Sequence, residues 1–121
     1  ALLIATPEYN YSVSGVLKGI EANLRADGSV DMTSDELATL DIVIASPHSA
    51  LRKADDQTAR LLHAVRQPGV HVIGHPRGRM YGSRPGVSAD WDAVFAEAAR
   101  TGVALEIDGD PSRQDLDHTL A

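Results

Sequence analysis

Three short apolar runs rich in β-branched residues, at 41–45, 70–74 and 103–107, constrain this chain most strongly. Between them lie two segments, 58–65 and 91–98, in which apolar residues recur at every third or fourth position. The runs are typical of buried strands, whereas the spacing between them is that of one face of a helix. Strands that alternate with helices in this way predict right-handed βαβ units in a parallel sheet. We therefore expect an α/β fold with four to five mostly parallel strands.

The first quarter of the chain fits two different structures. Residues 2–5 are apolar and predict a further strand. Residues 13–24 carry an apolar stripe at helical spacing, but residues 20–24 also alternate as a strand would. Gly15 and Gly19 each cost the interior of a helix about 1 kcal/mol relative to alanine. Periodicity alone therefore leaves helix and strand both open for this segment.

The composition limits the chemistry that this chain can perform. It has no cysteine, so disulfide bonds, thiolate metal ligands and a cysteine nucleophile are excluded. Eleven Lys and Arg residues against seventeen Asp and Glu residues give a net charge of −6, which makes nucleic acid an unexpected partner. No apolar run approaches the roughly 20 residues of a membrane span. We expect one cytoplasmic domain over residues 1–121, without a membrane partner.

Polar residues follow each of the three apolar runs. His48 comes after the first run, His75 after the second and Asp108 after the third, and Glu21 joins them if residues 16–24 form a strand. The carboxyl ends of parallel strands meet at one edge of a sheet, where functional side chains gather. Imidazoles with carboxylates are ligands for Zn²⁺, Mn²⁺ or Fe. This edge is a candidate metal site, although a histidine beside a proline also fits an ordinary loop residue.

A Gly-rich stretch with three arginines, residues 77–85, follows directly after His75. Guanidinium groups match the geometry of phosphate oxygens, and Arg77, Arg79 and Arg84 are the predicted substrate-binding residues. A solvated loop whose arginines pair with nearby acids fits the sequence equally well. Next to a metal site, these arginines would serve hydrolysis of a phosphate ester, in which metal ions activate water and neutralise phosphoryl charge. A phosphate-containing small molecule is the ligand that we expect.

The remaining histidines and the large aromatic residues fit structural roles. His71 falls on the other side of its strand from the candidate metal site, while His63 and His118 fit solvated positions. Trp91 and Phe95 have the spacing of core residues on a helix. We assign none of these five residues to the site.

Five stretches of the chain occur in the order of one known family. They read Leu-Lys-Gly-Ile-Glu at 17–21, Asp-Gly-Ser-Val-Asp at 27–31, Ile-Ala-Ser-Pro-His-Ser at 44–49, Gly-His-Pro-Arg-Gly-Arg at 74–79 and Leu-Glu-Ile-Asp at 105–108. Residues 19–121 thereby resemble the polymerase-and-histidinol-phosphatase (PHP) family, in the form attached to family-X DNA polymerases. That family is a distorted (β/α)7 barrel that holds up to three metals and hydrolyses phosphoesters. The resemblance implies that Glu21 bridges metals and that His48 and His75 complete one site with it, for Zn or Mn.

Some features depart from the PHP pattern. The His-x-His motif that opens the family's domain and the Asp-x-His motif that closes it are both absent, and Asp108 and Asp110 replace the usual asparagines. A complete barrel needs about twice this length, since the related eight-stranded barrel takes about 250 residues. We expect half a barrel that is weakly active or inactive. Its open sheet edges predict a homo-oligomer.

The first eighteen residues resemble a different family. Thr-Pro-Glu-Tyr-Asn at 6–10 follows an apolar run and is similar to the flavin-contacting loop of NADPH-dependent FMN reductases, which have a flavodoxin-like fold. The resemblance implies contacts to FMN from Thr6, Glu8, Tyr9 and Asn10. We therefore expect a join of two fragments near 16–19. Two alternatives to a phosphoesterase follow, namely a recombined or engineered scaffold without activity and an FMN-binding protein.

Overall fold

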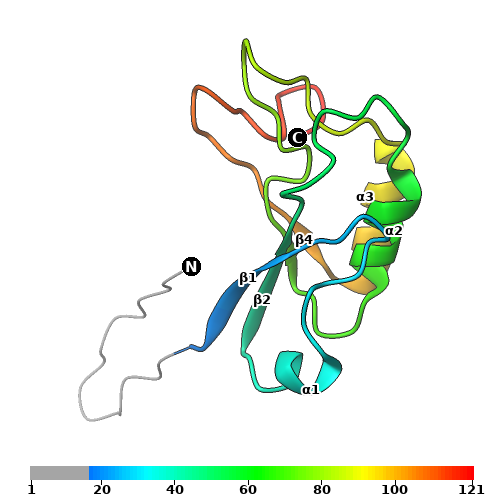
Figure 1. The fold of residues 1–121 in the computed structure, drawn as a ribbon, viewed down its shortest axis with the longest axis vertical. Coiled ribbons are helices and arrows are strands. Elements are labelled where there is room, and N and C mark those ends of the chain that lie inside the picture. The colour runs from blue at the N-terminus through cyan, green and yellow to red at the C-terminus, as the bar shows by residue number, and fades with distance from the viewer. Residues whose placement is uncertain (1–16) are drawn as a thin grey trace, which may run out of the picture.

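The computed structural model describes residues 17–121 (Figure 1). The strand expected at 2–5, and with it Thr6, Glu8, Tyr9 and Asn10, lies outside the described residues. So does most of the segment before the expected join. In the part of the chain that the structure describes, no helix is long and apolar enough to cross a membrane.

A single parallel sheet organises the described residues. Its strands are β1 (Gly19–Asn23), β2 (Ile42–Ser46), β3 (Val72–Ile73) and β4 (Ala104–Leu105), and they lie in the order β1-β2-β3-β4. Each strand pairs with the next one along the chain, as successive crossover connections require. The predicted α/β fold with four parallel strands is confirmed.

The sequence allows either a helix or a strand at residues 19–23, and the structure shows a strand. All five residues of β1 pair with β2, from Gly19 opposite Ile42 to Asn23 opposite Ser46. The pairing sets the alternation, because it buries Ala22 in the core and leaves Glu21 on the opposite face. Tertiary pairing with a strand some twenty residues away, which periodicity cannot report, decides the conformation here.

Two helices cover one face of the sheet. The helices α2 (Thr58–Arg66) and α3 (Trp91–Thr101) pack side by side, as Figure 1 shows. Asp90 caps α3, since its side chain accepts a hydrogen bond from the backbone N–H of Ala93. Gly102 ends α3 at a φ of 76°, which favours glycine. A four-residue helix, α1 (Ser34–Leu37), lies between β1 and β2.

The hydrophobic core lies between the sheet and these two helices. Its fully buried side chains include Val43, Ala45, Leu61, Val65, Ile73, Val94 and Ala98. The apolar stripes predicted on both helices thus supply core residues. Leu62 and Trp91 are only half-buried at the edge of the core, and the rings of Trp91 and Phe95 pair at 5.9 Å between centroids.

The segments that follow β2, β3 and β4 all gather at the same end of the molecule (Figure 1). This arrangement follows from the parallel sheet, because every strand delivers its carboxyl end to one edge. The histidines and arginines that the sequence places after the strands therefore meet at this end.

Candidate metal centre

Three side chains from neighbouring strand ends converge on one point. Glu21 comes from β1, His48 follows β2 and His75 follows β3, and each offers a ligand atom within 4.8 Å of the other two. Nε2 of His48 lies 3.3 Å from Oε1 of Glu21, and Nε2 of His75 lies 3.7 Å from the same oxygen. The structure thus brings together the three residues that the sequence predicts as ligands.

Gly74 makes room for this convergence. A Cβ atom at Gly74 would lie 2.3 Å from Oγ of Ser46 and 2.8 Å from Cγ2 of Ile44. Both contacts are too short for an unchanged structure, so a side chain at position 74 would force Ser46 or Ile44 to move. His75 follows with a φ of 26°, which is rare for a residue other than glycine.

A hydrogen bond on the far side of the His48 ring defines which of its nitrogens is free. Nδ1 of His48 lies 2.8 Å from Oδ1 of Asn23. An amide oxygen only accepts hydrogen bonds, so Nδ1 of His48 carries the hydrogen. In the neutral form of the ring, Nε2 is then the nitrogen without a hydrogen, and it faces Glu21.

Glu106 occupies the corresponding place behind His75. Its Oε2 accepts a hydrogen bond from the backbone N–H of His75 and lies 3.6 Å from Nδ1 of the ring. A carboxylate beside Nδ1 favours a hydrogen on that nitrogen and leaves Nε2 free. Asp108, the carboxylate expected at this strand end, is instead part of a turn, where its side chain accepts from the backbone N–H of Asp110.

Electrostatics keeps Glu21 ionised. Burial would raise the pKa of Glu21, but the Ser46 hydroxyl and the two imidazoles outweigh burial and hold that pKa below its ordinary value. The side chain of His48 is 46% exposed and that of His75 is 14% exposed, so ions in solvent can reach both rings. One carboxylate and two imidazoles that coordinate through unprotonated Nε2 atoms would form a donor set that suits a divalent cation.

An open cleft of about 380 Å³ contains this cluster. It is lined by Glu21, Ile44, His48, Leu51, His75, Arg84, Glu106 and Arg113. Arg84 is thus the one residue of the three predicted arginines that lines the cleft. Arg113 was not predicted, because nothing in its local sequence distinguishes it from a solvated turn residue.

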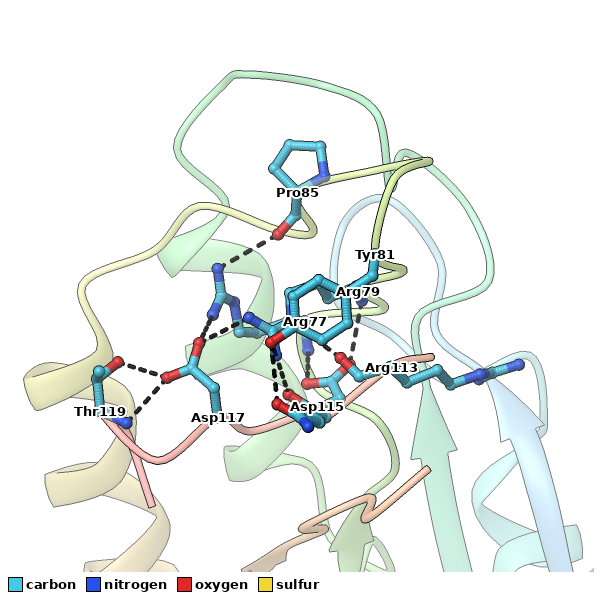
Figure 2. Close-up of polar contacts among 9 residues, drawn as sticks. Arg77, Arg79, Tyr81, Pro85, Arg113, Asp115, Asp117 and Thr119 are labelled. Atoms are coloured by element: carbon cyan, nitrogen blue, oxygen red, sulfur yellow. Dashed lines mark hydrogen bonds and ion pairs between the residues drawn. The ribbon is translucent and has the colours of Figure 1, made fainter. Parts of the chain in front are cut away.

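Arg77 and Arg79 belong to a separate network (Figure 2). Their guanidinium groups lie 2.7 and 2.9 Å from Oδ2 of Asp117. The Thr119 hydroxyl and backbone N–H, together with these two arginines, lower the pKa of Asp117 to about 2. Asp115, fully buried, accepts from the backbone N–H groups of Arg77 and Arg79. The network fastens residues 108–121 to the Gly-rich loop.

The backbone of Arg113 belongs to this network, but its side chain does not. Figure 2 shows it pointing away from Asp115 and Asp117. Its backbone carbonyl still accepts from Nε of Arg79 at 2.9 Å. The loop network therefore positions the backbone of Arg113, while the guanidinium group lines the cleft.

The other histidines lie apart from the cleft. Nδ1 of His71 accepts from the backbone N–H of Val43 at 3.1 Å, and Nδ1 of His63 lies 2.7 Å from the carbonyl oxygen of Asp27. His118 is exposed. None of the three lines the cleft that holds Glu21.

Comparison with known proteins supports the larger of the two resemblances. No protein-family model matches the chain. It is 39% identical over 102 residues to the DNA polymerase/3'-5' exonuclease PolX of Bacillus subtilis, and 38% identical over 97 residues to a probable phosphatase of Shewanella oneidensis. The chain is similar to both.

These matches cover 84% and 77% of this chain but only 18% and 36% of the two relatives. The chain therefore spans a minor part of the length of the curated relatives it matches. The matches support the PHP-like character of the chain, whereas the flavodoxin-like resemblance of the first residues has no support among them.

Proposed function

We propose that this chain is the metal-binding segment of a PHP-type, metal-dependent phosphoesterase, with Glu21, His48 and His75 as the ligands. The observation that carries this proposal is the convergence of three donor atoms, one carboxylate oxygen and two imidazole nitrogens, within 4.8 Å. Zn²⁺ or Mn²⁺ fits a set of two imidazoles and a carboxylate. The names of the two relatives, a DNA polymerase/3'-5' exonuclease and a probable phosphatase, agree with phosphoester hydrolysis.

Each polar residue of the cleft has a defined part in this proposal. A bound divalent cation would supply Lewis-acid polarisation of a phosphoryl oxygen and a water molecule of lowered pKa. Glu21 neutralises part of the added positive charge, and the imidazoles of His48 and His75 bind through unprotonated Nε2 atoms. Glu106 keeps His75 in the orientation that ligation requires.

Arg84 and Arg113 are the proposed phosphate-binding groups. Neither has a carboxylate within ion-pairing distance among residues 17–121, and both line the cleft that contains the ligands. Nε of Arg84 donates to the carbonyl oxygen of Gly78, which fixes the direction of its guanidinium group. Arg77 and Arg79 act from outside the cleft in this proposal, because Asp117 engages both.

Turnover by this segment alone is expected to be weak. Hydrolysis of phosphoesters commonly uses two metal ions, and three ligands hold one. Further carboxylates or histidines would have to come from outside this segment. A longer protein like the relatives, or a second copy of this chain, could supply them. Pairing of two copies would also cover β1 and β4, which form the edges of the sheet.

Metal binding provides the direct test. Isothermal titration of the metal-free chain with Zn²⁺ and with Mn²⁺ should show one site, and His48→Ala or His75→Ala should abolish it. His118→Ala is the matched control, because His118 is exposed and distant from the cleft. Binding that survives both ligand substitutions would place the metal away from these residues, and a wild-type chain that binds neither metal would support a scaffold without a metal site. Hydrolysis of p-nitrophenyl phosphate, measured on the same samples, reports turnover separately.

A further inference from the structure

Asn23, at the end of β1, is held by Asp31 through two hydrogen bonds. The Nδ2 amide group of Asn23 donates to Oδ2 of Asp31 at 2.8 Å, and the backbone N–H of Asn23 donates to Oδ1 at 3.0 Å. The backbone N–H of Asp31 returns a bond to the carbonyl oxygen of Asn23 at 3.1 Å. Asp31 therefore holds both the side chain and the backbone of Asn23.

The carboxylate decides which way the Asn23 amide points. Hydrogen bonding from the Asn23 side chain lowers the pKa of Asp31, so Asp31 is an ionised acceptor at neutral pH. An ionised carboxylate accepts only, and it therefore requires the NH₂ end of the Asn23 amide. The oxygen end is left to face Nδ1 of His48 at 2.8 Å.

We infer that Asn23 and Asp31 are positioning residues that fix the tautomer and the ring orientation of His48. The inference rests on the proposed metal-binding function of His48. Asp31 orients the Asn23 amide, and the amide oxygen in turn fixes the hydrogen on Nδ1 of His48. Nε2 then presents its lone pair toward Glu21 and His75. A second nitrogen held in this way raises ligand basicity and removes the cost of ordering the ring at binding.

A purely structural role for the pair is distinguishable from this one. Backbone groups already close the turn after β1, through the bond from Asp31 to Asn23 and the bridge between Leu24 and Val30. The side-chain amide of Asn23 is not needed for those contacts. Its two partners are Asp31 and His48, which places it between the turn and the metal cluster.

The tautomer of His48 in the metal-free wild-type chain is the first measurement. Nitrogen-15 NMR of histidine-labelled protein, at a pH where the imidazoles are neutral, separates protonated from unprotonated ring nitrogens. We expect the hydrogen of His48 on Nδ1. A hydrogen on Nε2 would overturn the inference, and this measurement needs no variant to fold.

Variants of Asn23 then test cause. Asn23→Leu removes the acceptor and should shift His48 to mixed tautomers while Zn²⁺ affinity falls about 10- to 100-fold. Asn23→Asp combined with Asp31→Asn keeps an acceptor toward Nδ1 and a donor–acceptor pair between the two side chains, so this double variant should retain the wild-type tautomer. Asp31→Ala frees the amide to rotate and should give an intermediate loss. Unchanged tautomer and affinity in Asn23→Leu, or equal losses in Asn23→Leu and in the double variant, would contradict the inference.

His75 serves as the control within the same molecule. Its Nδ1 faces Glu106 and has no contact with Asn23, so its tautomer should stay the same in every Asn23 variant. The two proposals also fail separately. A wild-type chain with the expected His48 tautomer that binds no Zn²⁺ refutes the metal site alone, whereas Zn²⁺ binding by the wrong tautomer refutes the positioning role alone.

Discussion

The Nε2 atoms of His48 and His75 face each other at 3.2 Å. Each ring is contacted on its other nitrogen, by Asn23 in one case and by Glu106 in the other. With the hydrogens on the Nδ1 atoms, both Nε2 atoms present lone pairs to one another, and two acceptors at this distance repel unless a cation lies near them. The ionised carboxylate of Glu21 lies beside both nitrogens and adds a negative charge. A bound metal cation would relieve this repulsion, so the geometry that is costly without metal would suit the proposed binding.

Any side chain at Gly74, even a methyl group, should destabilise the fold. Gly74→Ala places Cβ against Ser46 and Ile44, and overpacking of this kind costs about 1–3 kcal/mol in the free energy of unfolding. Urea denaturation measures the loss. Gly109→Ala is the matched control, because nothing lies within 4 Å of a Cβ there, and its change should stay within about 0.5 kcal/mol. Adding Ser46→Ala to Gly74→Ala should recover part of the loss, and simple additivity of the two changes would contradict this account.

Arg60 should stabilise the turn after β1 and the loop after His48 together. Although it lies on α2, it is 5% exposed, and its guanidinium group donates to the carbonyl oxygens of Leu24, Arg25 and Ser49. Arg60→Met preserves the apolar stem but leaves these acceptors unsatisfied, at about 1–3 kcal/mol for each that stays buried. We expect a loss of about 3 kcal/mol or more in the free energy of unfolding, measured by urea denaturation.

The matched control for Arg60 is Arg100→Met. Arg100 is an exposed arginine on α3 that pairs with Glu97, and such surface pairs contribute about 0–1 kcal/mol. Because Arg60 joins the strand of Glu21 to the segment after His48, Zn²⁺ affinity should also fall in Arg60→Met and not in Arg100→Met. Equal stability changes in the two variants would show that the buried bonds are not important.

The parallel sheet and the positions of His48 and His75 were predictable because strand periodicity and strand order report them. Glu21 depended on the ambiguous segment at 19–23 and on the PHP resemblance. The carboxylate behind His75 required one further step. Register places Ala104 opposite Val72 on the sheet, so Glu106, just past the end of β4, returns to that face, whereas Asp108 lies in the turn that follows. Counting from the pairing identifies Glu106, but the pairing itself comes only with the structure.

Residues whose role depends on distant segments could not be found from the sequence. Arg60 lies among core positions of α2, and only the remote carbonyl oxygens around it make its burial favourable. Arg113 belongs to an irregular segment, whose course is set by the buried Asp115. The strand at 19–23 was ambiguous for the same reason, since pairing with β2 decided it.

Acid should weaken the attachment of residues 108–121 through Asp117. The pKa of Asp117 is about 2 in the folded chain, against an ordinary value of 3.8. A carboxyl group with a depressed pKa contributes stability that is fully present above the ordinary value and is lost as the pH falls through the folded value. The free energy of unfolding should therefore drop between about pH 4 and about pH 2 more steeply in the wild type than in Asp117→Asn. Denaturation at a series of pH values measures both slopes, and parallel slopes would refute the assignment.

Substitution of Arg84 or Arg113 should weaken phosphate binding without changing the affinity for Zn²⁺. Charged hydrogen bonds contribute about 1.5–3 kcal/mol, so Arg113→Gln or Arg84→Gln should weaken inorganic phosphate binding to the Zn²⁺-loaded chain about 10- to 100-fold. Titration calorimetry measures the affinity, and Zn²⁺ affinity itself should be unchanged because neither arginine is a ligand. Arg100→Gln, on the distant α3, is the control.

The guanidinium groups of Arg77 and Arg79 are engaged by Asp117 and do not line this cleft, so Arg77→Gln should lower stability more than phosphate affinity. A phosphate affinity that depends on Arg77 and not on Arg113 would place the anion site on the Gly-rich loop instead.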